Sequence, residues 1–549
     1  MRISAVYYIA AVTATAVAIA SASPDQLVVD TASGKVRGVD EGTYSTFKGI
    51  PYGASTAGEG RWTAPKDPEP WEDVRDATKF GAICPQPKPV QDHFAEYGEM
   101  LGVDMSDVGV YTIDEDCLFL NVYTPNVTGD LPVMVWIHGG EFKEGAGEHL
   151  PADRLVTEDV VVVAINYRLG FLGYFAHPDL EDTNFGLLDQ VKALEWVQQN
   201  IASFGGDPDR VTIFGESAGA SSVLALMVCP LAEGLFTNAI AESPALFESV
   251  NVTKEEVGDL GVALGNYFNA TKDGSSQIDQ MRNLPAEDIV QVVQNFIDSP
   301  WANMSRTMFN LFTDDTSMPL SIYEAFQAGT QHQGVNLIIG NNKDDCPMPN
   351  HFSLEQYHSL INNAFGGNPS MLQHIADLIP ASTDEEALTA FKEYGTNVVL
   401  SAGSFAVAKA MARSSNNAST FYYFFDYVYP NHTEDGAFHG AELPFVLNYS
   451  TLGPDIPTYW TNFAKTGDPN GEKSDSTWLP NWPSFEEGSD SWQVLGSEIS
   501  NEPIPETKVE MFQLGDILLP PNYIVGTGPL FGSNMTWSLE NGVPEGPQA

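Results

Sequence analysis

Residues 204–219 read Phe-Gly-Gly-Asp-Pro-Asp-Arg-Val-Thr-Ile-Phe-Gly-Glu-Ser-Ala-Gly, and this stretch decides the fold. A run of strand-forming residues, Val211–Phe214, leads into the pattern G-x-S-x-G, and small residues in a helix-compatible segment, Ala218–Met227, follow it. The order of strand, sharp turn and helix places Ser217 at the apex of the turn, where its Oγ projects from the backbone. Small neighbours suit such a turn, because its strained backbone leaves no room for large side chains. We therefore interpret Ser217 as a nucleophile.

Short apolar runs alternate with amphipathic stretches along the rest of the chain. The runs rich in Val and Ile predict buried strands at Leu131–Ile137, Val160–Asn166 and Val335–Gly340, besides Val211–Phe214. Leu187–Ile201 has the spacing of a helix, and segments near 250–330 and 355–420 are also helix-like and are expected to form a cap-side subregion. Strands separated by helices predict an α/β fold, with a largely parallel sheet covered on both faces.

The N-terminus has the features of a secretory signal. Residues 1–22 contain a charge at Arg2, an apolar or small run from Val6 to Ile19, and the cleavage pattern Ala20-Ser21-Ala22. A membrane anchor is the poorer interpretation, because the run is rich in Ala and Thr and short for a span. Sequons for N-glycosylation agree with a secreted glycoprotein and occur at Asn126, Asn251, Asn269, Asn303, Asn417, Asn431, Asn448 and Asn534.

The chain is strongly acidic. Its 25 Lys and Arg residues against 73 Asp and Glu residues give a formal net charge of −48. Such a surface repels nucleic acid and anionic membranes, because binding to phosphates requires clustered cations. We take the charge as an adaptation for solubility in acidic or salty surroundings.

The chain resembles the type-B carboxylesterase/lipase family, which includes secreted fungal lipases and cholinesterases. The resemblance rests on the serine stretch and on four further segments, Glu115–Pro125, Asn184–Gln190, Gly436–Gly440 and Asn462–Asn470. It implies an α/β-hydrolase fold over one domain, residues 23–549, with a large, mostly parallel mixed sheet, helices on both faces and a cap or lid region. It also implies a Ser–Asp/Glu–His triad that needs no metal or other cofactor.

The resemblance assigns the other two triad positions. His439 falls at the base of the family, whereas its rival, His432, lies inside a sequon. The acid falls in Gly340–Cys346, where the family has G-x-N-x-D-E-G, so Asp345 is the expected acid and Asp344 the competing one. Cys346 stands in place of the usual Gly, and a Gly position sometimes requires a positive φ.

A pair of glycines follows the predicted strand Leu131–Ile137, where a loop has to bring backbone N–H groups close to a developing oxyanion. The family usually has three glycines here, and the third is replaced by Glu141. Gly140, Glu141 and Ala218 can still form the oxyanion hole, because every non-proline residue has an N–H group. A carboxylate aimed at the oxyanion would oppose it, so we expect the Glu141 side chain to turn away or to be protonated in an acidic medium.

The resemblance also bears on the four cysteines and on a lid. It pairs Cys84 with Cys117, whereas Cys229 and Cys346 either pair with each other or remain buried thiols; none of the four has metal-ligand spacing. The loop between Cys84 and Cys117 is a lid in the lipases of the family. Its apolar face could open at a lipid interface, or the helix could stay packed on the rim; this face contains Phe94, Tyr97, Met100 and Leu101.

The sequence thus predicts a secreted serine hydrolase that cleaves carboxylic esters through an acyl-enzyme, with a lipase as one interpretation. Its partner would be a small-molecule or lipid ester, with no nucleic acid and at most transient contact with a lipid interface. One alternative is an esterase for short or aromatic acyl groups with a fixed lid. Another is a non-catalytic adhesion or binding ectodomain of the same fold, although such proteins typically lack a triad member that this chain has.

Overall fold

The computed structural model describes the central part of the chain, from residue 27 to residue 518. The ranges are 27–87, 112–149, 152–246, 252–268, 270, 276–297, 310–346, 351–365, 368–414, 417–430, 433, 436–447, 453–473 and 476–518. The predicted signal, the apolar face at Phe94–Leu101 and the rival histidine His432 lie outside these residues.

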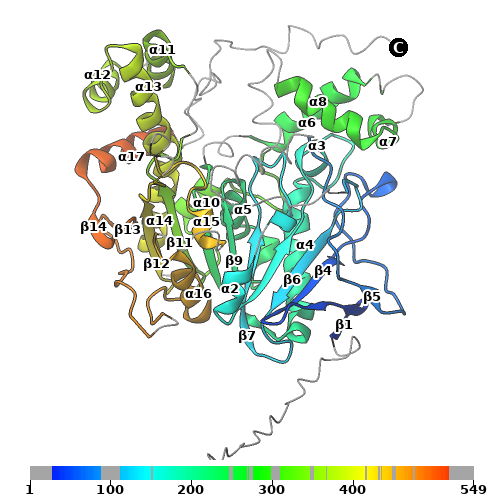
Figure 1. The fold of residues 1–549 in the computed structure, drawn as a ribbon. Helices are drawn as coiled ribbons and strands as arrows, with labels where there is room; N and C mark the ends of the chain where they lie inside the picture. The colour runs from blue at the N-terminus through cyan, green and yellow to red at the C-terminus, as the bar shows by residue number, and fades with distance from the viewer. Residues whose placement is uncertain are drawn as a thin grey trace, which may run out of the picture.

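One large sheet of eleven strands organises the molecule, and a small sheet of three strands lies beside it (Figure 1). The large sheet has the order β14-β13-β12-β11-β10-β9-β7-β8-β6-β4-β3. Its strands from β13 through β8 in this order are parallel, and the outer strands at both edges are antiparallel, so the sheet is mixed but mostly parallel. The strands are β3 (Val39–Asp40), β4 (Ser45–Pro51), β6 (Phe119–Thr124), β7 (Leu131–Ile137), β8 (Val161–Ile165), β9 (Gly206–Glu216), β10 (Asn238–Glu242), β11 (Asn336–Asn342), β12 (Thr420–Phe425), β13 (Ser491–Leu495) and β14 (Ile499–Pro503), with β1 (Val28–Thr31), β2 (Gly34–Arg37) and β5 (Arg75–Asp76) in the small sheet.

Side chains that alternate along each central strand bury both faces of the large sheet. In β7, Val133, Val135 and Ile137 belong to one hydrophobic core, whereas Met134 and Trp136 belong to another. Successive residues of a strand point to opposite faces, so a strand covered on both sides is apolar throughout. The first core is completed by α4 (Phe185–Asn200), α5 (Ala218–Leu226), α14 (Ala402–Arg413) and α17 (Glu506–Leu518), and the second by α2 (Asp153–Thr157), α15 (Leu443–Val446) and α16 (Ile456–Thr466).

Two groups of helices lie at the same end of the molecule, at the top of Figure 1. One contains α6 (Lys254–Tyr267), α7 (Gln277–Arg282) and α8 (Ala286–Ile297), and the other contains α11 (Leu354–Phe365), α12 (Pro369–Leu378) and α13 (Asp384–Glu393). The short helices α3 (Gly170–Gly173) and α10 (Ile322–Ala328) and the π-helix Tyr394–Ser401 complete the helical part. Among the described residues, no helix combines the length and apolar character needed to cross a bilayer.

The α/β fold predicted from the sequence is confirmed. The expected strands correspond to β7, β8, β9 and β11, and the expected helices to α4 and α5, each within a few residues of the predicted bounds. The described residues of the segments near 250–330 and 355–420 are largely helical, as their patterns indicated.

Candidate active site

A sharp turn between β9 and α5 carries the predicted nucleophile. Ser217 joins Glu216, the last residue of β9, to Ala218, the first residue of α5, and has φ 58° and ψ −122°. The glycines of the motif allow β7 to lie against this turn, because a Cβ on Gly215 or Gly219 would come within 2.5 Å or 2.1 Å of the Ile137 carbonyl oxygen. The G-x-S-x-G pattern is therefore a packing requirement around a strained serine.

The predicted base and acid are in direct contact. His439 Nδ1 lies 2.6 Å from Asp345 Oδ1, although 94 positions separate the two residues in the chain. The other oxygen of Asp345 accepts hydrogen bonds from the Asn341 side chain (3.0 Å) and from the Asn342 backbone N–H (3.1 Å). Since Asn341 and Asn342 end β11, the sheet itself fixes the carboxylate that orients the imidazole.

The neighbouring aspartate, the competing candidate for the acid, has different partners. Asp344 Oδ1 lies 2.7 Å from Lys392 Nζ, and its Oδ2 accepts a hydrogen bond from the Ala437 N–H at 2.9 Å. The structure therefore brings Asp345, and not Asp344, to His439.

The second nitrogen of the imidazole faces the nucleophile turn. His439 Nε2 lies 3.2 Å from Oε1 of Glu216, the residue directly before Ser217. The side chain of His439 is 27% exposed, whereas that of Asp345 is fully buried. Nδ1 of the imidazole thus contacts a buried carboxylate, and Nε2 lies beside the residue that precedes the strained serine. A buried acid on one nitrogen is what orients a general base for proton transfer through the other.

Buried glutamates surround this pair. Glu242 accepts a hydrogen bond from Trp460 Nε1 at 2.9 Å, and Glu442 accepts one from the Asn342 side chain. Burial raises the pKa of Glu216 to about 7 and that of Glu442 to about 8, and it raises the pKa of Glu242 well above its ordinary value. A raised pKa keeps a buried carboxyl protonated, and so uncharged, to a higher pH than an exposed one.

The pKa values of His439 and Asp345 shift in opposite directions. Burial alone would lower the pKa of His439, but the carboxylates of Glu216 and Asp345 outweigh it and raise this pKa. Burial would raise the pKa of Asp345, but the charge of His439 and the hydrogen bonds from His439 and Asn341 lower it. Asp345 therefore stays ionised and stabilises an imidazolium, which forms when the base accepts a proton.

The loop after β7 contacts the serine turn. A Cβ added to Gly139 would lie 3.3 Å from the Cβ of Ser217 and 2.7 Å from the carbonyl oxygen of Glu216. The next three residues all have positive φ, with 102° at Gly140, 52° at Glu141 and 56° at Phe142. This sharply turned loop therefore begins beside Ser217, and the residues predicted to form the oxyanion hole follow directly after Gly139.

The Glu141 side chain extends into solvent, as expected if it turns away from the serine. It is 67% exposed, and its Oε2 lies 2.7 Å from Lys143 Nζ. The carboxylate is therefore paired and hydrated, which weakens any repulsion that it exerts on a nearby oxyanion.

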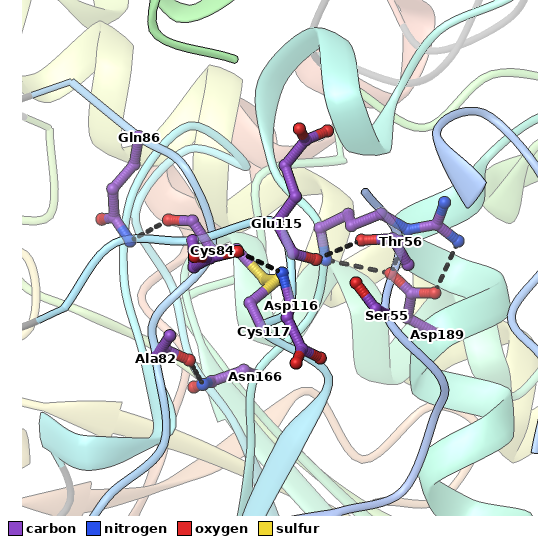
Figure 2. Close-up of a disulfide and its surroundings, with 12 residues drawn as sticks. Ser55, Thr56, Ala82, Cys84, Gln86, Glu115, Asp116, Cys117, Asn166 and Asp189 are labelled. Carbon is purple, nitrogen blue, oxygen red and sulfur yellow. Dashed lines mark hydrogen bonds and ion pairs between the residues drawn. A yellow bond between two sulfur atoms is a disulfide. The ribbon is translucent and has the colours of Figure 1, made fainter. Parts of the chain in front are cut away.

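The cysteines fall into two classes. Cys84 and Cys117 form the expected disulfide (Figure 2), whereas Cys229 and Cys346 are separate buried thiols and not a second bridge. Cys346 is not among the residues with positive φ, so the replacement of Gly causes no backbone strain there. The Cys346 side chain fits because residue 395 of the π-helix is a glycine. A Cβ at Gly395 would lie 2.2 Å from Cys346 Sγ.

Two of the predicted sequons lie in the described part of the chain. Asn126 and Asn417 are both exposed, and Asn126 Oδ1 accepts hydrogen bonds from the backbone N–H and hydroxyl of Thr128. The remaining sequons, at Asn251, Asn269, Asn303, Asn431, Asn448 and Asn534, lie outside the described residues.

The sequence analysis missed the residues that support the site. Glu216 occupies the variable position before Ser217, and a charged residue in a buried turn was a signal that could have been used. Glu242 and Glu442 lack such a signal, because only the fold shows that they are buried near the site.

Comparison with known proteins agrees with this geometry. The model of the "Carboxylesterase family" matches residues 25–510. The chain is 34% identical to the para-nitrobenzyl esterase of Bacillus subtilis (strain 168), over 88% of this chain and 97% of that enzyme. It is 33% identical to the cocaine esterase of Homo sapiens, over 82% of this chain and 83% of that enzyme. A solved structure of a PNB esterase superposes with a TM-score of 0.73 at 34% identity, covering 88% of this chain and 99% of its own.

Proposed function

Because the chain belongs to the carboxylesterase family and is a carboxylic-ester hydrolase, we propose that Ser217, His439 and Asp345 are its nucleophile, base and acid. The observation that carries this assignment is the 2.6 Å contact between His439 Nδ1 and Asp345 Oδ1, with Nε2 directed at the serine turn. A binding module of the same fold would not need this arrangement, in which a strained serine, an oriented imidazole and a buried acid lie together.

The reaction follows from the roles of these atoms. Ser217 Oγ attacks the ester carbonyl carbon while His439 Nε2 accepts its proton, and the resulting imidazolium then donates that proton to the leaving alkoxide oxygen. The acyl group remains on Ser217. A water molecule, activated by the same imidazole, then attacks the acyl-enzyme and releases the carboxylic acid.

The proposed oxyanion hole consists of the backbone N–H groups of Gly140, Glu141 and Ala218. The contact of Gly139 with Ser217 supports this proposal, since the loop begins beside the serine that directly precedes α5. Donors fixed in advance at the position of the developing charge stabilise the tetrahedral intermediate, and the loss of one typically lowers kcat by about 10²–10³-fold.

We propose small esters with an aromatic or bulky group as the substrate class, in preference to triglycerides. Three relatives are named para-nitrobenzyl esterase, cocaine esterase and pyrethroid hydrolase, which supports this class.

A series of p-nitrophenyl esters from acetyl to palmitoyl, with a benzoyl ester, tests the substrate class. We expect kcat/KM to be highest for short or aromatic acyl groups and to show no rise above the solubility limit. A rate that jumps when the substrate forms an interface would instead identify a lipase.

We also propose that the protein is secreted and glycosylated. The features of residues 1–22 and the exposure of Asn126 and Asn417 support this proposal. Expression in a eukaryotic secretory host, followed by N-terminal sequencing and glycosidase digestion, tests it. Retention of residues 1–22 or an unchanged mass after digestion would contradict it.

Replacement of the nucleophile tests the enzymatic assignment. Ser217→Ala should lower kcat by about 10⁶-fold, because the members of a triad act as a unit. Ser221→Ala, which changes a serine of α5 one turn further on, is the matched control and should keep most of the activity. A Ser217→Ala variant with most of its activity would refute the assignment.

A further inference from the structure

We propose that Gln86 is a positioning residue for the oxyanion hole, and that its side-chain amide fixes the loop Gly139–Gly147 to the disulfide-bonded segment Ala82–Gln86. The inference rests on the proposed function, because it concerns the donors of that same site. Gln86 lies 59 positions before Gly145 of the loop, and the geometry of these donors depends on this distant residue.

The Gln86 side chain forms two hydrogen bonds with the backbone of Gly145, one as donor and one as acceptor, and we call this pair of bonds the Gln86 clamp. Its Nε2 donates to the Gly145 carbonyl oxygen at 3.0 Å, and its Oε1 accepts from the Gly145 N–H at 2.9 Å. The same Nε2 donates to the Cys84 carbonyl oxygen at 3.0 Å. Gln86 is only 4% exposed, so water does not compete for these bonds, and leaving a buried partner unsatisfied is costly.

Gly145, which the Gln86 clamp holds, packs tightly against the start of the loop. It has φ +118°, and a Cβ at this position would lie 2.2 Å from His138 Nδ1 and 2.6 Å from the Gly139 carbonyl oxygen. The clamped residue therefore lies against the two residues that precede Gly140. A shift of Gly145 has to move His138 and Gly139, and with them the proposed oxyanion donors.

A second side chain ties the same loop to the same segment. Asn166 Oδ1 accepts a hydrogen bond from the Gly147 N–H at 2.8 Å, and Asn166 Nδ2 donates to the Ala82 carbonyl oxygen at 3.2 Å. Figure 2 shows Ala82, Gln86 and Asn166 around the disulfide of Cys84. The segment Ala82–Gln86 is thus a fixed support that holds the loop at Gly145 and at Gly147.

The loop needs this support because its conformation is unfavourable. Glu141 and Phe142 adopt positive φ angles of 52° and 56°, a region that is sterically unfavourable for residues other than glycine. Backbone strain persists only where the surroundings determine it. Without the Gln86 clamp, we expect the loop to relax and the N–H groups of Gly140 and Glu141 to move from the position that the oxyanion occupies.

The first test replaces the amide by a side chain of similar size. Gln86→Met should lower kcat by about 10- to 100-fold, because a displacement of about 1 Å can cost 10²-fold in rate. KM should change less than threefold, since the donors act on the transition state and not on the bound ester. Rates are expressed per reactive serine, titrated with a fluorophosphonate, so that an unfolded fraction does not mimic the effect.

Gln198→Met is the matched control. Gln198 also donates to two backbone carbonyl oxygens, those of Pro208 (2.8 Å) and Leu235 (3.0 Å), but Pro208 lies near the start of β9, far from the serine at its end. This variant should lose stability to a similar extent and keep kcat within twofold.

Gln86→Glu provides a readout that a purely structural role would not change. The carboxylate can accept from the Gly145 N–H, but it places an oxygen against the carbonyl oxygens of Gly145 and Cys84, whereas the protonated carboxyl can donate again. The ratio of its kcat to that of the unchanged protein should therefore rise as the pH falls from 8 to 5. This variant also decides the matter if Gln86→Met does not fold.

The possible results distinguish a failure of this inference from a failure of the proposed function. Equal kcat for Gln86→Met and Gln198→Met, or a ratio for Gln86→Glu that does not depend on pH, would overturn the inference while Ser217→Ala is still inactive. An effect on KM alone would assign Gln86 to substrate binding and would also overturn it. An active Ser217→Ala variant would refute the proposed function itself.

Discussion

The two halves of the active site are held in place by different means. The acid–base half depends on the ends of strands in the central sheet, where Asp345 follows β11 and receives hydrogen bonds from Asn341 and Asn342. The oxyanion half depends on a loop with consecutive positive φ angles, which Gln86 and Asn166 hold from outside. The sheet thus fixes the proposed acid, whereas the proposed oxyanion donors depend on contacts between distant segments.

The acid–base half should show the largest effect of a single change. Asp345→Asn should lower kcat by about 10⁴-fold, as in other serine triads, because the amide favours the wrong imidazole tautomer. Asp344→Asn should stay within about threefold, since this side chain binds Lys392 and the Ala437 N–H. Steady-state kinetics of the two variants measure the difference, and a reversed order would show that Asp344 is the acid.

Removal of the disulfide tests the support of the oxyanion half. Replacing both Cys84 and Cys117 by Ser should lower the free energy of unfolding by about 3–4 kcal/mol in the chain-entropy model, given their separation of 33 positions. If the segment Ala82–Gln86 supports the loop, kcat should also fall at temperatures where the variant is folded. A variant that is less stable but equally active would show that Gln86 holds the loop without the disulfide.

The buried glutamate beside the base should set the pH range of activity. Once it is ionised, which burial delays until the pH approaches its raised pKa of about 7, the Glu216 carboxylate favours the charged imidazole and so raises the pKa of His439. Glu216→Gln removes this effect, so the base stays neutral at lower pH and the acid limb of kcat/KM should move down by about 1 pH unit. The exposed Glu195, bound to Lys192, provides the control Glu195→Gln, which should leave the limb unchanged. A limb that moves up in Glu216→Gln would contradict this explanation.

The smallest effect is expected where the loop departs from the glycine-rich pattern. Glu141→Gly should leave kcat within about threefold, because the carboxylate is exposed and paired with Lys143. It should also stabilise the protein by about 1 kcal/mol, since Gly adopts a positive φ without a steric penalty. A large rise in kcat at neutral pH would show instead that the carboxylate opposes the oxyanion.

Local sequence patterns were enough to predict the sheet and the sharp turn that carries Ser217. The strands β7 and β8 are continuous apolar runs because both of their faces are buried, and the turn at Ser217 needs glycines within two positions. Such features depend on a few neighbouring residues, so they are visible without a structure.

The parts that the sequence left open depend on tertiary contacts. Asp344 and Asp345 are chemically identical neighbours, and only the end of β11 decides which of them faces the imidazole. Whether Cys229 and Cys346 pair depends on where the fold places the two loops that carry them. The role of Gln86 likewise depends on a contact over 59 positions. The π-helix Tyr394–Ser401, whose Gly395 makes room for Cys346, was likewise not predicted from a local sequence pattern.

Mass spectrometry of the protein after reaction with a fluorophosphonate tests the central assignment most directly. We predict one adduct, on the peptide that contains Ser217, with no adduct in Ser217→Ala and slow labelling in His439→Gln. An adduct on a different serine, or a fully folded protein that is not labelled at all, would contradict the assignment.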